Sequence, residues 1–398
     1  MEATPLTLDQ RRLRVGERFG LPYFDGVLLG AALALIAFSV FTLAVATPDD
    51  VPGQPLFFAM RQTIYAGVGL ALMFAVAKID YSRFREIRVG IYSLMIGSIL
   101  LVLLFGAAAR GSRRWIELPY FRFQPSELAK LLLIVALAAF VIERNRRGTP
   151  TSQTIRVLAL GLAPAALVFL QPDLGTGIVL VVITLAVLFI AGVRWTHFAA
   201  FGAVAAITAT LALAVAPAVG LPSPLRGYQQ DRLTAFLHPS NDPSDASYQV
   251  NQSVTAIGSG EKTGRGDNST QTELLFLPER HTDFVFAVIG ERFGFMGAAL
   301  VLSLYALLIW RMLRILTLSK NFYGTLIAGG IAAMLMFQIL VNVGMTLGVM
   351  PVTGITLPLM SYGGSSVIAT FLAIGLLQSI HVQARLNSRS RAPTPLLR

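Results

Sequence analysis

The segment Phe276-Leu-Pro-Glu-Arg-His-Thr-Asp-Phe284 brings charged side chains to the start of a long apolar run. Asp283 would stand at the N-terminus of that helix, where the helix dipole keeps a carboxylate ionised and able to act as a general base. The simpler alternative is a capping carboxylate that accepts hydrogen bonds from free backbone N–H groups. Glu279 shares a helix face with Asp283 only if the helix begins before residue 279, and is otherwise a loop residue. Arg280 and His281 complete this candidate site.

Further charges lie in the segment Arg113-Arg-Trp-Ile-Glu-Leu118. Trp115 suits a membrane interface, which is one interpretation, and a place beside a substrate is the other. The cations Arg113, Arg114 and Arg265 are candidates to bind an anionic group.

Glu127 and Lys130 are three residues apart and share one face of a predicted helix inside the apolar zone. Ionisable groups within a membrane are costly and are usually paired. A structural ion pair is therefore one interpretation, and a role in positioning a substrate headgroup is the other. Asp173, in Gln171-Pro-Asp-Leu-Gly-Thr-Gly177, is interpreted as the cap of the helix that follows a short turn.

Proline and glycine interrupt the apolar sequence in Met350-Pro-Val-Thr-Gly-Ile-Thr-Leu-Pro-Leu-Met-Ser-Tyr-Gly-Gly-Ser-Ser366. Irregular backbone at membrane depth survives only where it is buried in protein or lines a cavity. Free N–H groups at the start of the next helix could bind phosphate oxygens, and a plain break with a serine cap is the alternative. The candidate residues here are Ser361, Gly363, Gly364 and Ser365.

The elements that must position these residues are membrane helices. The chain has 398 residues, of which 55% are apolar and 13% charged, with a mean hydropathy of +0.66. A soluble protein is about 25% charged, and a membrane span takes about 20 apolar residues. We therefore expect an all-α polytopic membrane protein with ten spans and one large extracytoplasmic loop. The predicted spans are 25–46, 60–79, 89–108, 126–143, 156–171, 174–193, 197–220, 284–310, 322–348 and 366–382.

The distribution of lysine and arginine predicts the orientation of these spans. With the N-terminus inside, 20 of these residues lie in inside segments, 10 in outside segments and 2, Lys130 and Arg292, at membrane depth. The positive-inside rule then makes 1–24 a cytoplasmic tail, 25–382 the membrane domain with an outer loop at 221–283, and 383–398 a second cytoplasmic tail. Loop placement explains most of the net charge of +11, so no nucleic-acid partner is expected.

Several chemistries are excluded or disfavoured. The chain has no cysteine, which rules out disulfides and thiolate metal sites, and its four histidines are scattered. The cytoplasmic segments are too short to hold a nucleotide-binding domain. The glycine-rich segment Gly258-Ser-Gly-Glu-Lys-Thr-Gly-Arg-Gly266 has the spacing of neither nucleotide-binding loop, and we interpret it as a turn that lets the backbone pass close to another part of the chain.

Taken together, the four motif segments resemble the SEDS family (shape, elongation, division and sporulation), the polytopic polymerases of bacterial peptidoglycan. The likeness extends from Arg113 to the tenth span, with the segments in the same order. Arg280 and the pair Val352-Thr353 are more similar to the elongation type (RodA-like) than to the division type (FtsW-like). The resemblance implies that Asp283 is catalytic and that Trp115 is functionally important.

The resemblance also implies a substrate, a reaction and partners. The substrate would be lipid II, polymerised onto a polyprenyl-pyrophosphate-linked glycan at the outer face of the bacterial cytoplasmic membrane, within membrane lipids. Asp283 would deprotonate a sugar hydroxyl, and a divalent cation, Mg²⁺ or Mn²⁺, could share the binding of the departing pyrophosphate with cationic side chains. The candidates for that binding are Arg113, Arg114, Lys130, Arg265 and Arg280. The partners would be a class B penicillin-binding protein and the elongation complex. A lipid II flippase, a division-type polymerase and a non-catalytic scaffold are the alternatives.

Overall fold

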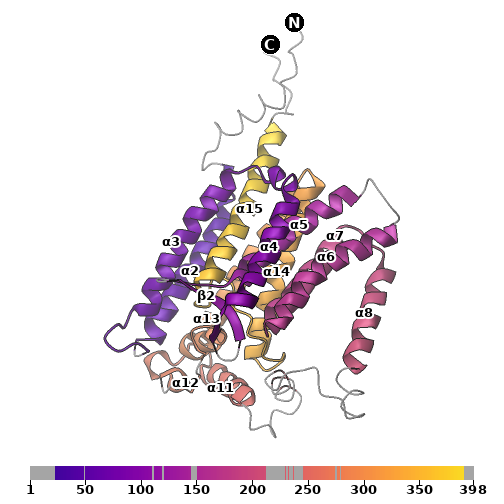
Figure 1. The fold of residues 1–398 in the computed structure, drawn as a ribbon. Helices are drawn as coiled ribbons and strands as arrows, with labels where there is room; N and C mark the ends of the chain where they lie inside the picture. Colours follow the sequence, from indigo (N-terminus) through magenta and orange to yellow (C-terminus); the bar gives the residue numbers. More distant parts are fainter. Residues whose placement is uncertain are drawn as a thin grey trace, which may run out of the picture.

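The computed structural model shows a bundle of long helices with smaller elements gathered at one end (Figure 1). It describes residues 23–48, 50–109, 112–118, 121–144, 150–211, 229, 232, 236, 245–273, 276–277 and 279–389. The helices that follow the apolar runs are α2 (Gly26–Ala46), α3 (Phe57–Lys78), α4 (Arg88–Phe105), α5 (Pro125–Arg144), α6 (Pro150–Leu170), α7 (Leu174–Ile190), α8 (Trp195–Thr210), α13 (Val285–Leu318), α14 (Phe322–Thr346) and α15 (Gly364–Arg389).

Each of the predicted spans thus has a helix. Eight of these helices are long and apolar enough to cross a membrane, and α7 and α8 are shorter apolar helices. The expectation of an all-α polytopic membrane protein is confirmed. Helices α5, α14 and α15 lie at the centre, with most of their apolar residues buried, whereas α3 and α4 expose much of theirs. An outer helix of a membrane bundle can expose apolar side chains because lipid is its solvent.

The beginning of α2 lies beside the second half of α15. The side-chain amide of Gln378 accepts a hydrogen bond from the backbone N–H of Asp25 (2.8 Å) and donates one to its carbonyl (3.0 Å). The Asp25 carboxylate caps α2 through Leu28 N (3.0 Å) and forms a buried ion pair with Arg311 of α13. Burial alone would raise the pKa of Asp25, but the hydrogen bonds from Arg311 and from Leu28 N, together with the charge of Arg311, outweigh it and hold the pKa below its usual value.

The opposite end carries structure that the sequence analysis did not predict. A three-stranded antiparallel sheet of β1 (Ala107–Ala109), β2 (Ser112–Leu118) and β3 (Phe121–Phe123) occupies the loop before α5. Strand β2 contacts α4 and α5, and β3 contacts α15. The backbone N–H of Gln124 donates to Ser365 Oγ (2.9 Å), which fastens the end of the sheet to the start of α15. The loop predicted to be the large outer one (221–283) contains α11 (Asp245–Ser259), η4 (Gly266–Asn268) and α12 (Thr270–Glu273). The short helix η2 (Tyr81–Arg85), between α3 and α4, lies instead at the end that carries Asp25, where Gln383 Nε2 donates to Asp80 Oδ1 (2.9 Å).

Helix α13 is broken at Gly294, whose φ of 63° and ψ of −160° are not helical. The break lets the glycine-rich segment lie against α13: Phe295 N donates to Glu261 O (2.9 Å) and Met296 N to Lys262 O (3.1 Å). A Cβ on Gly264 would collide with the backbone carbonyl of Arg292. The glycines therefore do allow a close backbone approach, and the partner is the broken helix.

The break lies inside the span that was predicted at 284–310. Helix α13 also packs against α11 and η4. Arg292, which was predicted at membrane depth, is buried and pairs with the exposed Asp267 (2.5 Å). The break itself was not predicted, because an apolar run gives no sign of a single glycine with a positive φ inside it.

Candidate active site

Asp283 lies in a compact turn that ends at the start of α13. The backbone N–H groups of Thr282 and Phe284 both donate to Glu279 O, each at 3.2 Å, and Thr282 Oγ1 donates to Glu279 Oε2 at 3.0 Å. Phe284 occupies the N-cap position of α13 and makes no side-chain capping bond. Asp283 is therefore not the helix cap, and Glu279 is a residue of the turn rather than of the helix.

The backbone carbonyl groups of His281, Thr282 and Asp283 each accept a hydrogen bond from a different donor. Tyr362 N donates to His281 O (2.8 Å), Ser361 Oγ to Thr282 O (2.6 Å) and Asn342 Nδ2 to Asp283 O (3.0 Å). The donors belong to α14 and to the segment before α15, so the turn is fixed against two parts of the bundle. A side chain on such a turn has a preset direction, which a catalytic base requires.

The donors on the segment before α15 are themselves held by α2 and α3. Ser39 Oγ of α2 donates to Met360 O (2.6 Å), and Gln62 Nε2 of α3 donates to Ser361 O (3.1 Å) and to Ser39 Oγ (3.2 Å). Gly363 N, just before α15, donates to Gln62 Oε1 at 3.4 Å. Ser39 and Gln62 are fully buried, so these bonds are shielded from competing solvent.

Aromatic rings pack around His281. The ring of His281 stacks on Phe58 of α3, with centroids 4.7 Å apart, and Tyr362 stands perpendicular to Phe58 at 4.9 Å. Burial raises the pKa of Tyr362 to about 12. Tyr362 is thus neutral at physiological pH and cannot serve as the base there.

The carboxylate of Asp283 lies beside Gly354, in the connection between α14 and α15. A Cβ added to Gly354 would lie 3.6 Å from Asp283 Oδ2 and 3.6 Å from Nη1 of Arg232. The same connection packs against the first turn of α7, where a Cβ on Gly175 would lie 2.7 Å from Thr353 O. Asp283 thus sits where the loop between α8 and α13, the 347–363 connection and α7 approach one another.

Arg280 is buried and engaged in structural contacts. Its guanidinium forms an ion pair with Asp50, in the connection between α2 and α3, and donates to the carbonyl of Thr272 in α12. Arg280 therefore links the turn to the connection between α2 and α3, a role that the sequence analysis did not anticipate.

Glu127 and Lys130 form the ion pair that one interpretation expected. Lys130 Nζ donates to both carboxylate oxygens of Glu127 at 2.8 Å, and both residues are buried. At the start of the same helix, Gln124 Nε2 donates to Asp173 Oδ2 (3.2 Å), and Asp173 Oδ1 accepts from Thr176 N (3.2 Å). The capping role of Asp173 is confirmed.

The remaining predicted site residues are spread over the same end of the bundle. Arg265 is exposed and donates to Ser259 O (3.0 Å) and to Thr270 Oγ1 (3.4 Å), so it braces its own loop. Trp115 is half-buried in β2. Arg113 and Arg114 are on the same strand, and their side chains lie outside the described part of the structure. Ser365, besides accepting from Gln124, donates to Arg122 O at 3.3 Å, and Gly364 begins α15.

A family model covering FtsW, RodA and SpoVE, described as a cell cycle protein, matches residues 26–386. The chain belongs to this family, the SEDS family.

Related SEDS proteins match along nearly the whole chain. A probable peptidoglycan glycosyltransferase FtsW of Idiomarina loihiensis is 37% identical over 380 residues, which are 94% of this chain and 90% of the relative. The peptidoglycan glycosyltransferase MrdB of Escherichia coli K12 is 36% identical over 371 residues, 92% of this chain and 97% of the relative. A solved structure on the coordination of polymerization and crosslinking by a peptidoglycan synthase complex gives a TM-score of 0.76 at 34% identity, and covers 91% of this chain and 98% of the other.

Among the residues that the structure describes, the donor set does not fit a divalent cation held by the protein. The described residues contain no group of three or more histidine, aspartate or glutamate side chains that could hold a metal ion. The charged group that lies next to Gly354 together with the Asp283 carboxylate is the guanidinium of Arg232, which repels a cation. No step of the reaction is therefore assigned to a metal.

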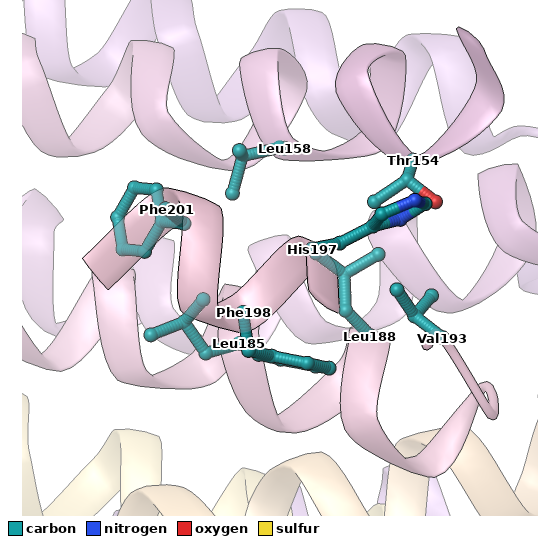
Figure 2. Close-up of a pocket in the computed structure, with 8 residues that line it drawn as sticks. All are labelled: Thr154, Leu158, Leu185, Leu188, Val193, His197, Phe198 and Phe201. Atoms are coloured by element: carbon teal, nitrogen blue, oxygen red, sulfur yellow. The ribbon is translucent and has the colours of Figure 1, made fainter. Parts of the chain in front are cut away.

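A pocket between α6, α7 and α8 lies away from the SEDS motifs. Figure 2 shows its mainly apolar lining with His197 beside Thr154. It holds about 10 Å³, room for a single water at most. Thr154 is in the first turns of α6 and Val193 follows α7, whereas Asp173 lies at the other end of both helices. This pocket is not part of the candidate site.

Among the residues that shape the site, Gln62, Arg232, Asn342 and Gly354 were not predicted from the sequence. Gln62 and Asn342 carried a usable signal, because an amide inside an apolar span must find a partner there. The sequence does not distinguish Arg232 from the other lysine and arginine residues of its loop. Gly354 would be found only from its positive φ of 74°.

Proposed function

We propose that this SEDS protein is a peptidoglycan glycosyltransferase that polymerises lipid II, with Asp283 as the general base. The names of its FtsW and MrdB relatives support the activity. The observation that supports Asp283 as the base is the fixed turn. The backbone carbonyl of Asp283 is bound by Asn342, and its carboxylate lies beside Gly354.

The reaction joins the 4-hydroxyl of one sugar to the anomeric carbon of a lipid-linked chain. As the new C–O bond forms, Asp283 accepts the hydroxyl proton. The bond from the anomeric carbon to the diphosphate breaks, and the diphosphate leaves with the electron pair. Diphosphate is a good leaving group, so no general acid and no nucleotide are required. General-base catalysis of this kind contributes about 10²- to 10⁴-fold.

The test uses purified protein, lipid II and detergent. We expect Asp283→Asn to reduce glycan polymer by about 10²- to 10⁴-fold while the protein stays folded. Glu261→Gln, at an exposed carboxylate of the same outer loop, is the matched control and should polymerise normally. Substantial polymer from Asp283→Asn would remove this residue from the mechanism. Because detergent leaves no membrane to cross, polymer formation also separates a polymerase from a flippase.

The orientation we infer places the site at the outer face of the bacterial cytoplasmic membrane and both termini in the cytoplasm. The segments that this orientation places in the cytoplasm hold 20 lysine and arginine residues, and the segments it places outside hold 10, which supports the orientation. The chain has no cysteine, so single cysteines can report on each side. A membrane-impermeant thiol reagent should label Lys262→Cys in spheroplasts and spare Lys320→Cys. The opposite pattern would contradict the orientation.

We further infer an elongation-type enzyme that works with a class B penicillin-binding protein. The pair Val352-Thr353 favours the elongation type, and the similarity to a synthase complex that also crosslinks favours a transpeptidase partner. Depletion in the source bacterium should produce round cells. Filamentous cells would indicate the division type instead. Co-purification with the tagged transpeptidase tests the partner.

A further inference from the structure

The short connection between α3 and α4 is fastened to the bundle along one side. Tyr81 of η2 is buried, and its ring stacks on Tyr323 of α14, with the centroids 6.1 Å apart. Ser379 Oγ of α15 donates to Ile79 O at 2.6 Å. Helices α14 and α15 therefore fix the position of η2 through its buried side.

The other side of this connection is exposed and mostly cationic. The exposed charged side chains within residues 78–89 are three cations and one carboxylate, namely Lys78, Arg83, Arg85 and Glu86. Arg88, at the start of α4, is less exposed and pairs with Glu143 at the end of α5. A surface with a net positive charge attracts anions, and here the backbone that carries it is held in place.

Exposed apolar side chains flank these cations. Ile79, Ile87 and Val89 expose 40%, 57% and 61% of their surface. The connection joins α3, which ends at Lys78, to α4, which begins at Arg88, and both helices are long and apolar enough to cross a membrane. A connection between two spans lies at the depth of the phospholipid headgroups. A lipid whose tails pack along α3 and α4 therefore places its headgroup at these cations.

We propose that η2 and its flanks form a binding site for the phosphate headgroup of an anionic phospholipid. Arg83 and Arg85 donate to the phosphate oxygens, while Ile87 and Val89 contact the acyl chains next to the headgroup. An acidic segment of another protein would match the cations but would leave the apolar side chains exposed, so a lipid is the better match. This site lies outside the proposed active site and does not depend on the proposed function.

The test measures lipid binding to the whole purified chain in neutral detergent by native mass spectrometry. The probe is phosphatidylglycerol, and zwitterionic phosphatidylcholine is the comparison. We expect the parent to prefer phosphatidylglycerol. Arg83→Gln with Arg85→Gln should weaken its binding by about fivefold for each arginine removed, and Glu86→Gln should strengthen it by removing a repulsive charge. Equal affinity of the parent and the double variant would overturn the proposal.

The matched control removes two other exposed arginines, one on α6 and one just before α8. This double variant, Arg156→Gln with Arg194→Gln, changes the net charge by the same amount and should bind phosphatidylglycerol as the parent does. If the two double variants lost the same affinity, the effect would be one of total charge, and no site at η2 would be needed.

A second measurement separates a lipid from other anions. A ligand that binds the folded state raises the midpoint of thermal unfolding, so phosphatidylglycerol should raise it in the parent and less in the Arg83→Gln, Arg85→Gln variant. The two proteins should unfold alike without lipid, because both side chains are exposed. Ile87→Ser should weaken phosphatidylglycerol binding without a change of charge. If the double variant instead lost only the binding of a polyglutamate peptide or of inorganic phosphate, a lipid site would be wrong.

Discussion

The Nδ2 of Asn342 lies 3.0 Å from the carbonyl oxygen of Asp283 and 2.7 Å from that of Ile355. One fully buried amide in α14 thus joins the turn that carries the carboxylate to the connection that carries Gly354. Both of these bonds go to backbone carbonyl groups, so under the proposed function we expect Asn342 to position Asp283.

Asn342→Leu should therefore lower kcat by about 10²-fold, the cost of a small misplacement of a catalytic group, with little change in KM. Steady-state kinetics of glycan polymerisation check this. Thr325→Val, at an exposed hydroxyl of the same helix, is the control and should retain activity. Equal kcat in the two variants would show that Asp283 does not depend on Asn342.

Removal of Arg280 should destabilise the protein. Breaking a buried ion pair costs about 3–5 kcal/mol, because Asp50 would keep its charge with no counter-ion. Arg280→Met should therefore lower the midpoint of thermal unfolding in detergent, followed by tryptophan fluorescence. The double variant Arg280→Met with Asp50→Asn should recover part of the loss. If Arg280 bound the diphosphate instead, the single variant would unfold normally and lose substrate binding.

Gly294→Ala should be among the more damaging glycine substitutions. A Cβ there would collide with the backbone of Gly264, and the positive φ adds strain, so we expect a loss of more than about 1 kcal/mol. Gly258→Ala is the matched control, because Gly258 lies inside α11 with no atom near the added Cβ, and alanine favours a helix. Thermal unfolding compares the two. A Gly294 variant as stable as the parent would mean that α13 can straighten.

The Asp25–Arg311 pair should make stability depend on pH. The pKa of Asp25 is lower in the folded protein than in the unfolded chain, so the unfolded state binds the proton first as pH falls. The stabilisation is therefore complete above the ordinary aspartate pKa of about 3.9 and is lost as the pH falls toward the folded value. Asp25→Asn should unfold at a lower temperature than the parent at pH 7. The difference should shrink below pH 4, and a difference constant with pH would contradict this origin.

The sequence was sufficient to predict the membrane spans, because the length and apolarity of a helix are local properties. It was insufficient to predict the partners of most charged residues. Arg280 and Asp50 are 230 positions apart, and no spacing rule links them. The Glu127–Lys130 pair was foreseeable because its members lie three residues apart on one helix. The same contrast explains why Asp283 could be proposed from its motif, whereas the presence of Arg232 beside the same glycine could not be predicted.

The bond between Ser39 and Gln62 has a consequence for inhibition. These side chains join α2 to α3 within the bundle and hold the segment that donates to the turn. A lipophilic compound that wedged the two helices apart would release Ser361 and, with it, the carbonyl of Thr282. Such a compound would inhibit the enzyme after entering from the lipid, and it would not need to resemble a sugar or a phosphate.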